Sequence, residues 1–453
     1  MNETKPVMEP PDVQAGMKNA WRFSAFNALS FQIVLGSPMI LYAKSLHANA
    51  TVLGIIAGMM PLLVICQIPA AQYINRIGYK RFVLAGWGTR TLFTFGMVLV
   101  PLVSPLLDAT TRLVLMLALL FGFNLVRGIS SCAWLPWITH LVPEDQRGRY
   151  VSRDAAMANL GSFLTIIVAA VCLGRTPHPW QFSVIFAFSA VMGVMSLMFL
   201  NRVPDVPITG EVRASSHPVP WLEMLRHPPF QKLLRFVVVW ALAYGGFNTF
   251  TVAFLKTETG LTESKILFVT SVSFLGGLSS LWLLGHRLDH VGSKPILTLS
   301  LGMWLLIVGF WIALAGGALA AHLPLILVLQ FFMGLFAVLV GMATSRLAMA
   351  TIPALGRNHF FVLYSVFANV VLGLAPILWG LIIDLIGGRE TVLLGIHWNH
   401  YSIFFALVLL VFAGTLALAS RLHEPKAASL EALLTDIMFE SPQRLWLRVW
   451  PRD

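Results

Sequence analysis

The chain has 453 residues, of which 57% are hydrophobic and only 11% are charged, and its mean hydropathy is +0.78. So little polar surface excludes a water-soluble globule of this length and indicates a polytopic membrane protein. The net charge of +11 does not indicate a nucleic-acid partner, because the basic residues are spread over many short segments rather than gathered in one patch.

Twelve apolar stretches are long enough to cross about 30 Å of hydrocarbon as helices of roughly 20 residues. They lie at 22–44, 51–73, 81–104, 112–138, 153–174, 179–201, 234–255, 264–285, 295–319, 323–350, 359–386 and 399–421. The sequence therefore predicts an all-α polytopic membrane protein with twelve transmembrane helices. Residues 1–20 lack the apolar core of a cleavable signal, so we expect the first span itself to direct insertion.

The apolar stretches fall into two groups of six. We expect a terminal segment at 1–20, six-helix bundles at 21–201 and 233–422, a proline-containing linker at 202–232 and a tail at 423–453. The three cysteines, Cys66, Cys132 and Cys172, lie separately within spans and are expected to be packing residues.

Basic residues favour the loops on the side of the termini. That side carries Arg76, Lys80, Arg81, Arg147, Arg149, Arg153, Arg202, Arg213, Arg226, Lys232, Arg235, Arg287, Lys294, Arg346 and Arg357. The opposite loops carry Lys44, Arg112, Arg175, Lys256, Lys265 and Arg389. This bias predicts that both termini are cytoplasmic, and we expect a bacterial inner membrane.

Two loops repeat each other. Residues 71–80 (AQYINRIGYK) and 285–294 (GHRLDHVGSK) share a pattern in which Asn75 corresponds to Asp289, at an offset of 214. A second set recurs at an offset of 210, where Pro143, Arg147, Tyr150, Ala158 and Asn159 match Pro353, Arg357, Phe360, Ala368 and Asn369. The chain thus consists of two repeats of a six-span unit, and such internal symmetry is typical of secondary transporters.

On these loops the chain resembles the major facilitator superfamily, whose loop after the second span reads Gly-x-Leu-Ala-Asp-Arg-x-Gly-Arg-Lys. The second copy matches this pattern at Asp289, Gly292 and Lys294, and the first copy matches at Arg76, Gly78 and Lys80. The departures are Ala71 in place of Gly and Asn75 in place of Asp. The resemblance covers residues 20–422 and implies two pseudo-symmetric six-helix bundles joined by a cytoplasmic loop.

The resemblance implies a cytoplasmic gate in which the acidic residue of each loop lies against a helix start of the other half. Asp289 would face the fifth span near Arg153, and position 75 would face the eleventh span. Asn75 has no charge, so we expect the contact made by the first copy to be weaker than the one made by Asp289. The alternative is that Asn75 only caps a turn. The gating candidates are Asn75, Arg76, Gly78, Lys80, Arg147, Asp289, Gly292, Lys294 and Arg357.

Arg90 and Arg127 are the only basic residues near the middle of a predicted span. An arginine there costs roughly 2.5 to 3.5 kcal/mol on insertion scales and is normally retained where it faces a cavity or a partner. No carboxylate lies at the same depth. A bound anion could balance these charges, whereas backbone carbonyls, Asn124 and water are the alternative.

Polar side chains form stripes on three of the four spans that line the central cavity in the resembled family. Asn124, Arg127 and Ser131 share one helical face, as do Tyr244, Asn248 and Thr251, and Asn27, Ser30 and Ser37 of the first span do so roughly. The binding candidates are Asn27, Arg90, Asn124, Arg127, Ser131, Tyr244, Asn248 and Gln330. Each stripe taken alone could serve helix-to-helix hydrogen bonding instead.

These observations predict a secondary active or facilitative transporter of a small organic solute, anionic or amphipathic, working by alternating access. The alternatives are a non-transporting sensor or assembly factor of the same fold, or a multidrug efflux antiporter. We expect no enzyme activity, cofactor, metal site or nucleic-acid partner, because no catalytic, metal-binding or phosphate-binding motif is visible. A coupling proton carried by the substrate is one option, uniport or anion exchange fits equally well, and we expect a monomer in the bilayer.

Overall fold

The computed structural model describes residues 10–143, 147–206, 225–283, 292–351, 357–393 and 395–422. The helices of the first half are α1 (Pro10–Leu35), α2 (Ser37–Ser45), α3 (Ala50–Leu63), η1 (Val64–Cys66), α4 (Gln67–Ile77), α5 (Tyr79–Leu102), α6 (Ala109–Ser131), α7 (Trp134–Leu141), α8 (Arg147–Leu173) and α9 (Pro179–Asn201). Those of the second half are α11 (Pro228–Tyr244), α12 (Phe247–Thr257), α13 (Glu263–Leu283), α15 (Ser293–Ala315), α16 (Leu323–Thr351), α17 (Arg357–Ile386) and α18 (His400–Ser420). Strands β1 (Thr391–Leu393) and β2 (Ile396–Trp398) pair as an antiparallel hairpin.

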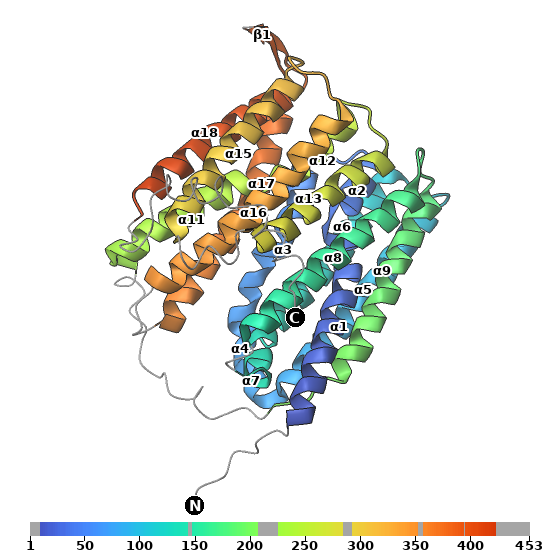
Figure 1. Ribbon diagram of the computed structural model, residues 1–453. Coiled ribbons are helices and arrows are strands. Elements are labelled where there is room, and N and C mark those ends of the chain that lie inside the picture. Colours follow the sequence, from blue (N-terminus) through green and yellow to red (C-terminus); the bar gives the residue numbers. More distant parts are fainter. Residues whose placement is uncertain are drawn as a thin grey trace, which may run out of the picture.

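The long helices run side by side, and the β1–β2 hairpin projects from one end of the molecule (Figure 1). We call this the hairpin end, and the opposite end, where α1 begins and α18 finishes, the terminal end. α1 begins at Pro10, well before the predicted first span. Most of the predicted linker, residues 207–224, and the tail at 423–453 lie outside the described residues.

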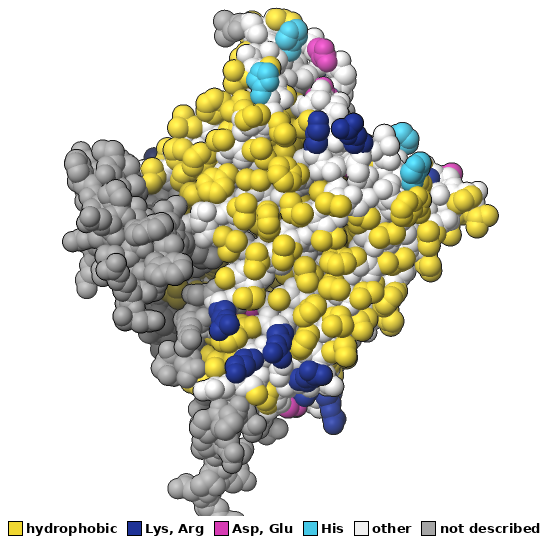
Figure 2. Space-filling view, turned by 45° about the vertical axis from the view of Figure 1, so that its right-hand side comes forward, with side chains coloured by type: hydrophobic (Ala, Val, Ile, Leu, Met, Phe, Trp, Pro, Cys, Tyr) yellow, Lys and Arg dark blue, Asp and Glu magenta, His cyan; other side chains and the backbone are white. Residues whose placement is uncertain are grey.

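Eleven single helices or runs of consecutive helices in the described ranges are long and apolar enough to cross a membrane, and each coincides with a predicted span. The remaining span, predicted at 264–285, coincides with α13, which is not among the eleven. Hydrophobic side chains form a broad band across the surface, between Lys and Arg side chains below and charged and His side chains above (Figure 2). The prediction of an all-α protein with twelve membrane helices is confirmed.

Two of the spans are broken at corresponding places in the two halves. The first span breaks at Gly36, between α1 and α2, and the seventh breaks at Gly245 and Gly246, between α11 and α12. Gly36 and Gly246 are separated by 210 residues, the offset of the sequence repeat. Gly246 has a φ of +80°, in the left-handed region that favours glycine. Paired interruptions of this kind mark the substrate site in many transporters.

The two repeated loops have the same backbone conformation where α5 and α15 begin. Gly78 has a φ of +90° and a ψ of 151°, and Gly292 has a φ of +94° and a ψ of 170°. A side chain would be strained at this φ. Both copies of the repeated loop therefore have glycine where the backbone φ is positive.

Candidate functional site

The two halves meet closely along α3 and α17 at the hairpin end. A Cβ atom added to Gly54 would lie 2.2 Å from the carbonyl oxygen of Pro376, and one added to Gly58 would lie 2.2 Å from that of Gly373. On the other helix, a Cβ added to Gly380 would lie 2.4 Å from the carbonyl oxygen of Ala50. Only glycine allows the backbones to approach so closely. We call this contact the glycine seam.

A carboxylate from the second half caps the end of the glycine seam. Asp384, near the hairpin end of α17, accepts hydrogen bonds from the backbone N–H groups of Ala50 (3.0 Å) and Thr51 (2.8 Å) and from the Thr51 hydroxyl (2.5 Å). The first turn of α3 has N–H groups without partners inside the helix, and a negative charge there is favourable. Asp384 therefore joins the two halves by capping a helix of the opposite half.

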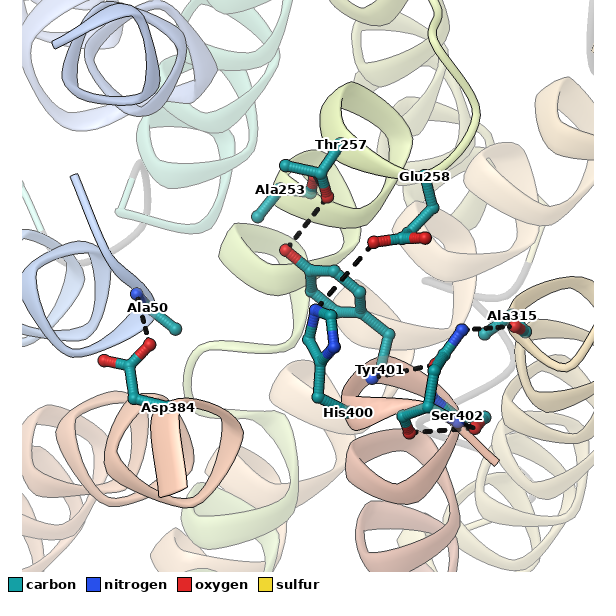
Figure 3. Close-up of polar contacts among 10 residues, drawn as sticks. Ala50, Ala253, Thr257, Glu258, Ala315, Asp384, His400, Tyr401 and Ser402 are labelled. Atoms are coloured by element: carbon teal, nitrogen blue, oxygen red, sulfur yellow. Dashed lines mark hydrogen bonds and ion pairs between the residues drawn. The ribbon is translucent and has the colours of Figure 1, made fainter. Parts of the chain in front are cut away.

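Further charged groups surround this contact at the hairpin end. Figure 3 shows Asp384 facing Ala50, and beside it Tyr401 and His400 facing Thr257 and Glu258. The Thr257 hydroxyl donates to the phenol oxygen of Tyr401 at 3.2 Å, and His400 Nε2 lies 3.9 Å from a Glu258 carboxylate oxygen. Lys44 of α2 lies within electrostatic range of both Asp384 and Glu258. The Tyr401 and His400 contacts join helices of the second half, whereas Asp384 makes a polar contact between the halves.

Deeper in the membrane span, Arg90 is fully buried in the first half. It lies about 16 Å along α5 at 1.5 Å per residue, near the middle of the helix, and only 2% of its surface is exposed. Its guanidinium donates to the amide oxygen of Asn27 at 2.6 Å and lies over the rings of Trp87 (5.1 Å) and Phe123 (5.2 Å). These neighbours are uncharged, so they do not neutralise the arginine.

Arg127 lies about 27 Å along α6, within electrostatic range of Arg90. Among the described residues its half-buried guanidinium has no hydrogen bond and no ion pair. Two cations thus face one region of the membrane interior, where no described carboxylate is paired with either. An anion in this region would be stabilised by both arginines, because opposite charges interact strongly where the dielectric constant is low.

The other candidates of the first half lie on the same face of α6. Asn124 is buried, its amide nitrogen donates to the Leu120 carbonyl at 3.0 Å, and its amide oxygen has no partner among the described residues. Ser131 accepts a hydrogen bond of 2.7 Å from the side chain of Gln67, at the start of α4. The structure thus brings Asn27, Arg90 and Arg127 together and places Ser131 nearer the terminal end.

The candidates of the second half are not joined to these residues by any hydrogen bond in the described part of the chain. Tyr244 stacks on Trp240 at 5.2 Å and meets Trp304 edge to face at 5.7 Å. Asn248 is exposed on α12. Gln330 is fully buried, and neither of its amide atoms has a partner among the described residues.

The gating candidates are described only in part. Arg76 lies in the last turn of α4, Lys80 in the first turn of α5, and Lys294 in the first turn of α15. Asp289 and the side chains of Asn75, Arg147 and Arg357 lie outside the described residues. The cytoplasmic gate therefore stays a prediction.

Three features of the site were missed in the sequence. The first two are the helix breaks at Gly36 and Gly246, which their offset of 210 would have revealed. The third is Asp384, which could equally have paired with Arg389 but instead caps α3. No local signal reveals that contact, because its partners are separated by more than 330 residues.

Comparison with known proteins decides the family. The family model described as Major Facilitator Superfamily matches residues 23–303 and 241–450. The chain belongs to the major facilitator superfamily. Its members are transporters, so the chain is a secondary transporter rather than an enzyme.

The solved structures that resemble this superfamily member share its fold at low sequence identity. A D-xylose–proton symporter matches with a TM-score of 0.70 at 13% identity, covering 91% of this chain and 98% of the other. A nucleoside transporter variant matches with a TM-score of 0.67 at 10% sequence identity, and the match covers 91% of this chain and 100% of the other. The xylose transporter XylE from E. coli, in an inward open conformation, matches with a TM-score of 0.64 at 16% sequence identity. This match covers 93% of this chain and 98% of the other. No curated protein matches the sequence.

Proposed function

We propose that this transporter moves a small organic anion, or an amphipathic molecule with one anionic group, and that Arg127 binds the negative charge. The observation that carries the proposal is the unpaired guanidinium of Arg127 inside the membrane span, within electrostatic range of the buried Arg90. A lone arginine there is costly. An anion that neutralises it while it is bound accounts for its presence.

We further propose that transport proceeds by alternating access between the two halves. The glycine seam and the Asp384 cap close the hairpin end, which supports a state open toward the terminal end. Two of the similar structures are described as inward open or inward-facing. The basic residues at the terminal end support cytoplasmic termini and a bacterial inner membrane. The terminal end is then the cytoplasmic one.

The test is a thermal-unfolding screen of the purified protein against anionic, cationic and neutral metabolites. A ligand present at roughly 100 times its dissociation constant raises the free energy of unfolding by about 2.7 kcal/mol. We expect anions to stabilise the wild type and to lose this effect in Arg127→Gln. Arg127→Lys keeps the charge, and Arg81→Gln removes an exposed arginine at the terminal end, so both controls should still respond.

If only neutral or cationic compounds stabilise the protein, the substrate is not an anion, and a multidrug antiporter is favoured instead. An equal response to anions in Arg127→Gln would show that this arginine has a structural role.

A further inference from the structure

A groove of about 320 Å³ separates the two halves beyond the glycine seam, toward the terminal end. One wall comes from η1 and α4, with Ile65 and Ile68, and the other from α17, with Val362 and Val366. The amides of Gln67 and Asn369 are among its few polar groups. Its volume lies at the lower end of the range for small-molecule sites, and its lining suits a hydrocarbon chain.

The apolar walls of the groove are exposed at a depth on the terminal-end side of the membrane middle. Ile65 and Ile68 are 47% and 54% exposed, and Val362 on the opposite wall is 42% exposed. Ile65 follows the start of α3 by about 22 Å at 1.5 Å per residue, which is beyond the middle of a hydrocarbon layer of about 30 Å. Apolar side chains exposed at that depth are suited to contact with acyl chains, and we infer that the groove opens sideways into one leaflet.

The residues of α6 next to Arg127 pack against one wall of the groove. Gly128 packs directly on α3, because a Cβ added there would lie 2.2 Å from the Leu63 carbonyl oxygen. The next residue along α3 and η1, Val64, lines the groove. Ser131, one turn beyond Arg127, accepts the hydrogen bond from Gln67. The segment of α6 that carries the unpaired arginine therefore packs against the wall of the groove.

The opposite junction of the two halves offers no such path among the described residues. There α8 and α13 approach closely near mid-span, where a Cβ added to Gly277 would lie 3.4 Å from the Asn159 amide oxygen. A cavity at that junction lies near the hairpin end, beside Lys265, and Arg127 is not among its lining residues.

We propose that the groove receives the hydrocarbon chain of a single-chain anionic amphiphile, which moves in from the leaflet at the terminal end and places its acidic head at Arg127. This inference rests on the proposed function, since it assumes that Arg127 binds the anion. The charge of the head complements the arginine, and the apolar walls complement the chain. The volume accommodates one chain rather than two.

The test uses dodecanoate carrying a photoreactive diazirine, with the wild-type protein in lipid nanodiscs and mass spectrometry to locate the label. We expect labelling within residues 61–71 and 362–370. Ile68→Trp and Val362→Trp narrow the mouth and should lower this labelling about tenfold, as expected when about two methylene groups lose their contacts. Leu92→Trp changes a lipid-facing residue of α5 that is 69% exposed and should label like the wild type. Arg127→Gln should lose the labelling.

Equal labelling of the groove by the diazirine analogue of dodecanol, or equal labelling of all lipid-facing segments, overturns the proposal, because the groove would then hold bulk lipid. Butyrate separates the two levels of inference. If butyrate stabilises the protein through Arg127 while dodecanoate does not enter the groove, the anion site stands and sideways access is wrong. If neither acid acts through Arg127, the proposed function fails as well.

Discussion

Removing the Asp384 carboxylate should shift the transporter away from the state that is closed at the hairpin end. Asp384→Ala loses acceptors for two backbone N–H groups and one hydroxyl at the start of α3. Loss of a helix cap costs about 0.5 to 2 kcal/mol. Because the cap joins opposite halves, this free energy is lost only from the closed state. If the loss of the cap costs the closed state about 1 to 2 kcal/mol, the ratio of closed to open molecules falls about five- to thirtyfold.

Asp108 provides a matched control. It caps α6 with the same pattern, accepting from the backbone N–H groups of Thr110 and Thr111 and from the Thr111 hydroxyl. The Thr111 hydrogen bonds hold the pKa of Asp108 below its usual value. This cap joins residues of one half, so Asp108→Ala should lower stability without changing the balance between closed and open states.

The assay is the distance between spin labels at Thr176→Cys and Val392→Cys, two exposed positions at the hairpin end, one in each half. Cys66, Cys132 and Cys172 are first replaced by serine. Asp384→Ala should add a longer-distance population, and Asp384→Asn, which keeps an acceptor but loses the charge, a smaller one. Unchanged distances in Asp384→Ala, or an equal change in Asp108→Ala, would refute the reasoning.

Two further changes test the gates. Gly54→Ala brings a methyl group against the Pro376 carbonyl, so it should separate α3 from α17 and lengthen the distance between the same spin labels. Gly88→Ala is the control and should leave this distance unchanged, because nothing lies within 4 Å of the added atom. Wild-type label distances in both variants would contradict the role of the glycine seam as a gate. Asn75→Asp restores the charge of the family pattern and should favour the outward-facing state roughly two- to fivefold, the effect of an anion at a helix start. Unchanged cysteine accessibility from the two sides of the membrane would count against that cytoplasmic latch.

The sequence revealed those features of the fold that depend on local pattern. Apolar length predicted the spans, and the repeat paired Gly78 with Gly292, which have the same backbone conformation in the structure. Periodicity also placed Asn124, Arg127 and Ser131 on one face of α6. These predictions succeed because helix geometry fixes which residues of one segment lie together.

Contacts between helices were much harder to predict. The sequence indicated that Arg90 and Asn27 are polar, but not that one donates to the other. Gln330 was chosen by its span alone, and the rotation of α16 buries it completely. The Asp384 contact depends on how two whole halves meet in one state of the transport cycle. Hydrophobic periodicity carries no information about that arrangement.

Pro376 links the helix break of the second half to the closed end of the molecule. Its carbonyl oxygen faces Gly54 of α3, while its Cα and Cβ lie 2.9 and 2.8 Å from the position of a Cβ added to Gly246. A ligand that changes the angle between α11 and α12 must therefore move α17 against the glycine seam, because close-packed backbones cannot absorb the change by side-chain adjustment. In the first half, Gly36 occupies the position equivalent to Gly246, and α2 beyond it packs on α12. We therefore expect bending at the two breaks and opening at the hairpin end to be parts of one motion.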